Sequence, residues 1–458
     1  MKVFQLMLVL ISLSSCASYH PLALLRGRVE QRLRMPAEKA LRIEAAKIHH
    51  PLLARVPLNL ANGVGPDQAA VLAVILNPTL RANRDRRGLA SAQLIQAGIL
   101  PNPTISYGRD FVSGGATAGT VSAWGFTGSW EFSSLVSRPA KLAAAQANAR
   151  SIDLDIAWTE WQTAEAAKLA LYRVVALRQE LSRGQQIDED QQKTVETLQA
   201  AVDRHEKSVL DLAAAQASRE DAHATVLSLQ QELDRQRLEF KRAVGVLPEA
   251  KLQIEDGIKL PSHLLPPPES DLSANVESRR LDLLGLHQGY QSQEQTLRAA
   301  VLAQFPKVTL GFTHASDTTD VHTMGFGISI ELPVFDRNQG TIATEKATRQ
   351  KLFDEYVARV FEAHADIAAA IADIRSLNSQ IAAAEAAIPI LQNLVDIAQK
   401  ASEEGEADIL SYFQARTNLN QKTLQLIKLK QQLMDARSAL ELASGRYLPA
   451  DSAKKKME

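Results

Sequence analysis

Residues 323–332, Thr-Met-Gly-Phe-Gly-Ile-Ser-Ile-Glu-Leu, alternate between small or polar side chains and large apolar ones. Successive side chains of a β-strand point to opposite faces, so this run predicts a strand with one apolar and one polar face. A tilted strand of about ten residues is long enough to cross an outer membrane. This stretch decides the fold, because the long helical patterns around it fit several architectures.

Three further runs alternate in the same way, at residues 104–111, 123–132 and 308–313. Turn-rich segments separate the paired runs. Arg109 is an exception to the alternation, because it is a charged residue on an apolar face. Four aromatic side chains are candidates for the aromatic girdles of a membrane strand: Tyr107, Trp124, Trp130 and Phe132. A soluble sheet packed on a helix alternates identically, and taken alone it would be the commoner explanation.

Four strands in one chain cannot close a barrel, because lipid would then face unpaired strand edges. If the strands cross a membrane, several chains must therefore contribute strands. Three chains would supply twelve, an even number within the usual range. The oligomer is thus an inference from the chemistry of strand edges.

The chain repeats itself at an offset of about 200 residues. Leu-Pro-Asn-Pro-Thr-Ile at 100–105 corresponds to Phe-Pro-Lys-Val-Thr-Leu at 305–310. Phe126 corresponds to Phe326, and Gly245 corresponds to Gly445. Because solenoid repeats are much shorter, this period indicates duplication of a whole structural half.

Each half combines an opening helical stretch, two strands, one very long helix and a return helix. The predicted ranges are 66–98, 139–203 and 208–244 in the first half, and 275–304, 340–402 and 408–444 in the second. Helices of this length need partner helices along their whole length. A solitary antiparallel coiled coil has the same periodicity, and only the strands argue against it.

Composition excludes several classes of protein. The 458 residues carry 51 Lys and Arg against 52 Asp and Glu, which leaves no basic field for nucleic acid. One cysteine permits no internal disulfide and no cysteine-based zinc site. No run reaches the roughly 18 apolar residues of a spanning helix, so a polytopic inner-membrane protein is not expected.

That cysteine, Cys16, follows a short positive start, a mostly apolar stretch and Leu13-Ser14-Ser15. The layout predicts a signal peptide at 1–15 and resembles the bacterial lipobox, in which the cysteine carries the lipid. Ala17 in place of aspartate resembles the pattern sent to the outer membrane. The alternative is an ordinary cleaved signal with an incidental cysteine.

Taken in order, the motifs resemble the TolC-type outer-membrane efflux family over about residues 60–447. They are Asn77-Pro78-Thr79-Leu80, Leu100-Pro101-Asn102-Pro103, Arg279-Arg280-Leu281-Asp282-Leu283 in place of the usual Arg-Pro-Asp-Leu, and Glu331-Leu332-Pro333-Val334-Phe335-Asp336-Arg337-Asn338-Gln339-Gly340. The last stretch resembles the heavy-metal branch and related resistance-nodulation-division (RND) systems more than the general drug-efflux branch.

The resemblance implies an α+β fold, with long antiparallel helical hairpins forming a periplasmic tunnel. It also implies four transmembrane β-strands per chain in a trimeric twelve-stranded barrel. We expect six segments: the signal peptide 1–15, a lipid-anchored segment 16–65, repeats 66–245 and 275–445, a Pro-rich equatorial linker 246–274 and a tail 446–458.

Family members meet their adaptor at the hairpin tips, which implies contact residues here. They are His205, Glu206, Lys207, Ser208, Glu404, Gly405 and Glu406, with His205 standing where a glycine is usual. A polar constriction just above the tips would fall at Asp211, Ser411 and Gln414. Because some members have two aspartates where this chain has Ser411 and Gln414, an aspartate gate would be incomplete. Acidic residues near a helix start, such as Asp211 and Asp408, are also favoured simply by the helix dipole.

Glu131 and Glu331 occupy equivalent positions on the polar strand faces of the two halves. Three chains would place six carboxylates near the junction of barrel and helices. Such a ring would favour cations over anions in transit.

The sequence therefore predicts a passive outer-membrane exit duct of a tripartite efflux system, not an enzyme. Its expected partners are two further copies, a periplasmic adaptor, an inner-membrane pump and outer-membrane lipid, and its cargo is heavy-metal cations or small toxic compounds. We expect no cofactor and no metal site, since the ten histidines are scattered and no metal or nucleophile motif occurs. The alternatives are a duct for type I protein secretion and, from another class, a periplasmic coiled-coil adaptor lipoprotein.

Overall fold

A computed structural model describes residues 18–53, 56–115, 118–407 and 409–448. The chain divides into two compact units, residues 1–36 and 37–458. The first unit contains helix α2 (Arg26–Leu33), which has no buried residue and carries an ion pair between Arg26 and Glu30 at 2.7 Å. The predicted signal peptide and Cys16 lie outside the described residues.

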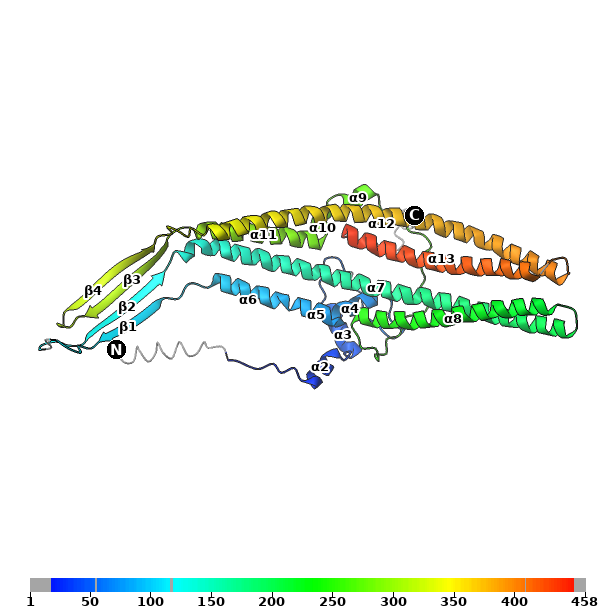
Figure 1. Ribbon diagram of the computed structural model, residues 1–458, viewed down its shortest axis with the longest axis horizontal. Coiled ribbons are helices and arrows are strands. Elements are labelled where there is room, and N and C mark those ends of the chain that lie inside the picture. The colour runs from blue at the N-terminus through cyan, green and yellow to red at the C-terminus, as the bar shows by residue number, and fades with distance from the viewer. Residues whose placement is uncertain (1–17, 54–55, 116–117, 408, 449–458) are drawn as a thin grey trace. The chain divides into compact units, whose positions relative to one another are not determined.

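The second unit contains the two halves predicted from the repeat (Figure 1). The first half consists of α3 (Glu38–Ala46), α4 (Pro66–Leu76), α5 (Pro78–Arg84), α6 (Arg86–Gly98), β1 (Thr104–Asp110), β2 (Ala123–Glu131), α7 (Ser134–Asp203) and α8 (Val209–Val244). The second half consists of α9 (Glu269–Ser273), α10 (Val276–Arg279), α11 (Leu281–Leu302), β3 (Lys307–Ser316), β4 (His322–Glu331), α12 (Gln339–Glu403) and α13 (Ile409–Ser444).

Neither opening stretch is the single helix that its periodicity predicts. The stretch 66–98 forms three helices, and Pro78 causes the first break, because it lacks a backbone N–H and disfavours helical geometry at the residue before it. The Asn77 side chain accepts a hydrogen bond from the Leu80 N–H and caps α5 instead. The second stretch, 275–304, is interrupted at Arg280, whose backbone is extended.

The long helices are confirmed and somewhat longer than predicted: α7 has 70 residues and α12 has 65. Each packs antiparallel to its return helix. Gly184 lets α7 approach α8 closely, since a Cβ atom there would lie 3.2 Å from a methyl group of Leu229. The proline in each long helix, Pro139 or Pro389, does not end it.

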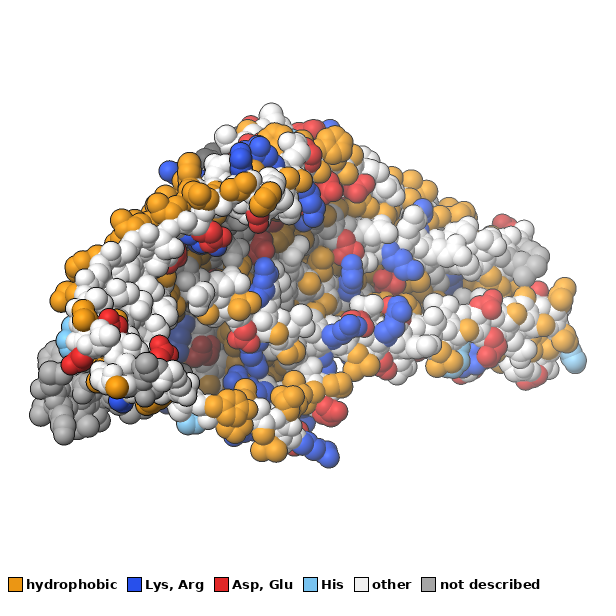
Figure 2. Space-filling model, turned by 60° about the vertical axis from the view of Figure 1, so that its left-hand side comes forward, with side chains coloured by type: hydrophobic (Ala, Val, Ile, Leu, Met, Phe, Trp, Pro, Cys, Tyr) orange, Lys and Arg blue, Asp and Glu red, His pale blue; other side chains and the backbone are white. Residues whose placement is uncertain are grey.

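The four strands form one antiparallel sheet in the order β1-β2-β3-β4. The pairing of β2 with β3 joins the two halves, with Phe126 opposite His314 and Trp130 opposite Leu310. This register places the apolar side chains of all four strands on one face, where Phe326 is 85% exposed. Figure 2 shows hydrophobic side chains along the outer edge of the sheet, at the left of the view.

A buried apolar cluster holds the second half together along its helices. Ile367, Ile371 and Ile374 of α12 pack in it with Leu433 and Leu440 of α13. By length and composition α12 also contains one stretch apolar enough to cross a membrane, and 22% of that stretch is buried within the chain. A core helix of a soluble protein passes the same test, so this stretch is weak evidence of a span.

The Pro-rich linker runs against both halves. Val64 and Ile254 form a parallel bridge, and the Val64 N–H donates to Gln253 O at 2.9 Å. Farther on, the Asn378 side chain of α12 bonds both backbone groups of Leu264, accepting from its N–H and donating to its oxygen. These contacts fix the linker beside the middle of the helices (Figure 1).

Candidate functional sites at the hairpin tips and the base of the sheet

The two hairpin tips turn in the same way. His205 and Gly405 both adopt left-handed backbone conformations, with φ of 59° and 76°. The N–H of Glu206 then donates to Ala201 O at 2.9 Å, and that of Glu406 to Ala401 O at 2.8 Å. These bonds satisfy carbonyl groups at the ends of α7 and α12. The glycine expected at the first tip is therefore replaced by a residue that keeps the same conformation at some cost in strain.

Asp211, predicted to line a constriction, caps α8. Its carboxylate accepts from the Ser208 N–H at 3.1 Å, and its own N–H donates to the Ser208 hydroxyl at 3.2 Å. Ser411 and Gln414 are exposed on α13, where Gln414 bonds Asn418 at 3.1 Å. Asp408 lies outside the described residues.

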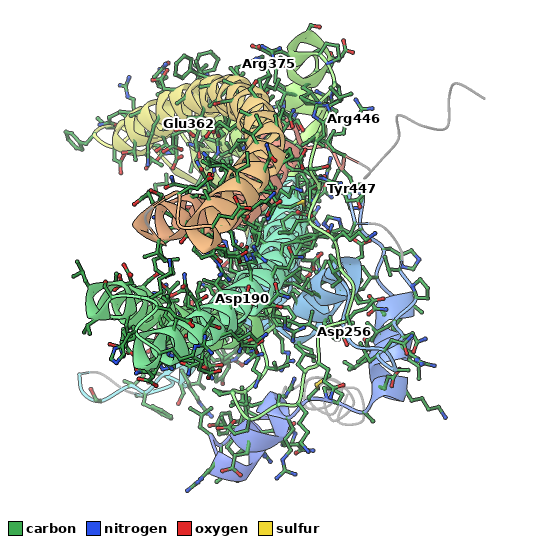
Figure 3. The ribbon with its side chains drawn as sticks, turned by 90° about the vertical axis from the view of Figure 1, so that its right-hand side faces the viewer. Asp190, Asp256, Glu362, Arg375, Arg446 and Tyr447 are labelled. Atoms are coloured by element: carbon green, nitrogen blue, oxygen red, sulfur yellow. The ribbon has the colours of Figure 1, made fainter. Side chains whose placement is uncertain are left out.

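Polar contacts missed by the sequence analysis join the two hairpins near their tips. The Arg416 guanidinium on α13 lies 2.9 Å from an Asp190 carboxylate oxygen on α7 and donates to the Tyr412 hydroxyl at 2.6 Å. Farther along, Lys207 donates to Ser402 O at 3.1 Å. Figure 3, which faces the hairpin end, labels Asp190 between the two hairpins.

Beneath these polar links the tips share an apolar cluster. Leu198 of α7 and Leu212 of α8 pack with Val395, Phe413 and Leu419 of the second hairpin. A groove of about 640 Å³ runs between the hairpins beside this cluster. The tips thus combine an apolar contact with a few breakable polar ones.

At the other end of the long helices, three charged side chains share the polar face of the sheet. Glu331 ends β4 and pairs with Lys307, the first residue of β3, at 3.2 Å. Glu131 ends β2, and its carboxylate accepts hydrogen bonds from the Ser133 hydroxyl and from the Ser134 N–H. Both predicted carboxylates therefore lie at the base of the sheet, but a lysine that we had not considered accompanies them.

A buried charged cluster joins α7 of the first half to α13 of the second. Glu165 and Glu441 are 2% and 3% exposed. Lys168 lies 3.0 Å from Glu165, and Arg437 lies 3.2 Å from Glu441. Although burial opposes it, the charges of Glu165 and Asp67 hold the pKa of Lys168 above its ordinary value. Burial, and then the charge of Glu165, raises the pKa of Glu441 to about 7.

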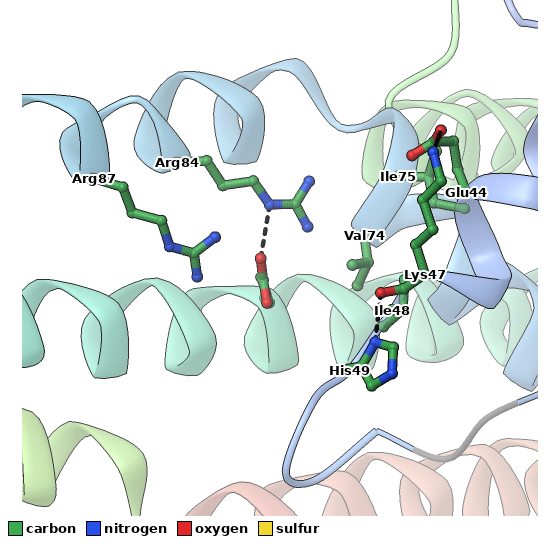
Figure 4. A pocket seen from close by; sticks show the side chains of 9 residues that line it. Glu44, Lys47, Ile48, His49, Val74, Ile75, Arg84 and Arg87 are labelled. Carbon is green, nitrogen blue, oxygen red and sulfur yellow. Dashed lines mark hydrogen bonds and ion pairs between the residues drawn. The ribbon is translucent and has the colours of Figure 1, made fainter.

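Another cavity, of about 320 Å³, lies between α3, α5 and α7 (Figure 4). Arg84 pairs with Glu160 at 2.7 Å, Arg87 with Asp153 at 2.9 Å, and Lys47 with Glu44 at 2.8 Å. Because each cation there already has a carboxylate, the cavity offers no free charge to a ligand. Within the described part of the chain, no group of three His, Cys, Asp or Glu residues could hold a metal ion.

An antiparallel four-stranded sheet that continues into two long helical hairpins is the fold of outer-membrane channel subunits. A solved structure of CusC matches this chain with a TM-score of 0.72 and 18% identity, covering 88% of this chain and 99% of that one. The outer membrane protein VceC of Vibrio cholerae matches with a TM-score of 0.69 and 18% identity, covering 83% of this chain and 96% of that one. The open-state MtrE channel of Neisseria gonorrhoeae matches with a TM-score of 0.69 and 16% identity, covering 87% of this chain and 97% of that one.

Sequence comparison points to the same kind of protein. The profile of the family described as "Outer membrane efflux protein" matches residues 272–446, in the second half of the chain. The cation efflux system protein CusC of Escherichia coli K12 is 26% identical over 188 residues. That stretch is 38% of this chain, and it spans only 39% of the relative's length. The predicted family and fold class are thereby confirmed.

Proposed function

We propose that this protein is the outer-membrane exit duct of a tripartite efflux system, a passive conduit without catalytic activity. The observation that carries the proposal is the sheet: its apolar side chains are exposed on one face, and β1 and β4 are unpaired edges among the described residues. Lipid would cover the apolar face, and the edges would pair between copies. Three copies would close a twelve-stranded barrel above a tunnel of six hairpins.

We propose heavy-metal cations or small toxic compounds as cargo, delivered by an inner-membrane RND pump through a periplasmic adaptor. The matches to a cation efflux protein and the stretch Glu331–Gly340 support this branch. The adaptor would meet the tips, where Val209 is 71% exposed beside His205, Glu206, Lys207 and Ser208. The second tip, with Glu404, Gly405 and Glu406, would present the equivalent surface.

We propose that the constriction just above these tips is held by the link between Arg416 and Asp190. Asp211, Ser411 and Gln414 would line it as predicted, with Asp211 also capping its helix. Since the Arg416–Asp190 pair joins the two hairpins of one chain, breaking it would let them separate at the tips.

The first test is the mass and location of the protein extracted from separated membranes. We expect an outer-membrane trimer of about 150 kDa, three times the 50.1 kDa chain, with mixed α and β circular dichroism. A monomer in the inner-membrane or soluble fraction would contradict the duct and favour the adaptor. Two hairpins that follow two strand pairs already argue against an adaptor, for which one hairpin is expected.

A deletion strain separates the leading proposal from type I secretion. We expect higher sensitivity to transition-metal salts or toxic compounds, restored by the intact gene. Loss of a secreted protein with unchanged sensitivity would assign the duct to secretion instead.

We also propose that Cys16 carries the lipid that anchors the processed chain to the outer membrane. Metabolic labelling with radioactive palmitate should mark the wild-type protein and not a Cys16→Ser variant. Labelling of neither protein would favour an ordinary cleaved signal, and equal labelling of both would place the lipid on another residue.

A further inference from the structure

Lys307 stands where the first strand of the second half begins, directly opposite Glu331 in the register of β3 and β4. Its ammonium group lies 3.2 Å from the Glu331 carboxylate, and the two side chains are 67% and 69% exposed. An ion pair as exposed as this contributes little to stability. Its charges therefore remain available to the solvent on that face of the sheet.

Glu131, the other carboxylate of this face, has different bonding partners. Its hydrogen bonds to Ser133 and Ser134 tie it to the start of α7, where the helix dipole favours a negative charge. The Ser133 hydroxyl also accepts from the Val308 N–H at 3.1 Å, next to Lys307. The two halves are thus unequal: one carboxylate caps a helix, and the other pairs with a lysine.

All three charges lie on the face opposite the exposed apolar side chains. The register puts Glu131 opposite Thr309 and Lys307 opposite Glu331, whereas Trp130, Leu310 and Ile328 alternate onto the other face. In a closed barrel the apolar face meets lipid and the polar face lines the lumen. The three charged residues would then surround the passage where the barrel joins the helices.

Resting on the proposed duct, we propose that Lys307 sets the ion selectivity at this junction. Three chains present six carboxylates from Glu131 and Glu331 and three ammonium groups from Lys307. The net charge of the ring is then −3 instead of the −6 expected from the carboxylates alone. The passage prefers small inorganic cations weakly, and Lys307 keeps that preference weak.

Reversal potentials in planar bilayers under a KCl gradient test this assignment with the full-length protein. In water, a unit charge about 8 Å from the ion path changes the local ion concentration roughly twofold. The potassium-to-chloride permeability ratio should therefore rise roughly twofold or more in Lys307→Gln and fall in Glu331→Gln. Both differences should shrink at 1 M salt, where the Debye length is about 3 Å.

Arg109→Gln is the matched control, because Arg109 carries the same charge in the same sheet and lies on the apolar face opposite Trp124. It should leave the ratio unchanged. Pores whose ratio is the same in Lys307→Gln and wild type would overturn the role of Lys307 and leave the duct standing. An equal effect of Arg109→Gln would also overturn it, since the wrong face would then line the lumen. Failure of the wild-type protein to form pores at all would count against the duct itself.

Discussion

Gly245 lies so close to Asn77 that a Cβ atom on the glycine would come within 2.4 Å of the asparagine Cα. The same contact recurs in the second half, where a Cβ on Gly445 would lie 2.9 Å from the Arg280 side chain. In each half the residue that faces the glycine also donates a side-chain hydrogen bond to the end of the return helix. Asn77 donates to Ala243 O at 3.2 Å, and Arg280 donates to Ala443 O at 3.3 Å. Each return helix therefore ends against the opening helices of its own half.

Gly245→Ala should destabilise the protein substantially. Gly245 has a φ of 87°, which costs an alanine roughly 1–2 kcal/mol, and the backbone of Asn77 leaves no room for the methyl group. Thermal unfolding of the detergent-solubilised protein should show a clearly lower Tm. Gly88→Ala, with nothing within 4 Å of the added atom, is the control and should leave the Tm equal or higher. Equal Tm values for both variants would contradict the close contact.

Arg416→Ser should loosen the hairpin tips. It removes the ion pair with Asp190 and the bond to the Tyr412 hydroxyl, leaving the apolar cluster as the main contact between the tips. We expect a higher single-channel conductance in bilayers, and a similar increase in Asp190→Asn. The double variant should add little, because both changes break the same link.

Arg173→Ser serves as the control for this link. Arg173 pairs with Asp435 at 3.4 Å across the same two helices, but farther from the tips. Its loss should leave the conductance near the wild-type value. If it raised the conductance as much as Arg416→Ser does, the tip would not be the narrowest point.

His50 should make the attachment of residues 50–53 sensitive to acid. Its Nδ1 accepts from the N–H groups of Leu52 and Leu53 at 3.1 and 3.0 Å, and its Nε2 bonds Ala157 O at 2.8 Å. Only a neutral ring can accept at Nδ1. Burial lowers the pKa of His50, with Arg84 acting in the same direction and Ala157 and Glu160 opposing.

A lowered histidine pKa gives stability that is present above the ordinary value of about 6.5 and lost as the pH falls below it. Hydrogen exchange at Leu52 and Leu53, corrected for intrinsic rates, should therefore accelerate below about pH 6. His50→Asn should abolish this dependence. His49→Asn, which changes the exposed neighbour, should retain it, and a wild type with flat exchange would refute the acid-sensitive contact.

Glu441 should give the opposite pH dependence to His50, with stability lost as the pH rises. Its pKa of about 7 lies above the ordinary value, so the stability it contributes is complete below about pH 4.5 and is lost as the pH rises through 7. Between these values Glu441→Gln should flatten the fall of Tm with rising pH relative to the wild type. Identical slopes would mean that Glu441 is ionised throughout. Glu44→Gln, at an exposed position of α3, is a control that should not change the slope.

Local patterns predicted the elements but not the contacts between them. The alternation at 323–332 and the 200-residue offset indicated the strands, the long helices and the glycines that end them. Lys307 and Arg416 were missed because their partners lie 24 and 226 residues away. A charged residue on a helix is usually solvated, and only the register of α7 against α13 shows that Arg416 meets Asp190.

Pro78 and Arg280 mark breaks in the helices that hydrophobic periodicity did not predict. The helical pattern of residues 66–98 continues across Pro78, yet the backbone requirement of proline prevails and α4 ends before it. The sequence favoured Asp211 slightly more as a constriction residue than as a helix-start carboxylate. The structure adds the capping bonds with Ser208, which spacing alone left undecided.

The β2–β3 pairing has an evolutionary consequence. It joins the two halves within one chain, and in a closed ring β4 would meet β1 of the next copy in the same way. Six pseudo-equivalent halves would then surround the channel. Because both halves stand in one chain, each is free to change its sequence without the other. His205 can thus differ from Gly405, and Glu131 can cap a helix while Glu331 holds a lysine.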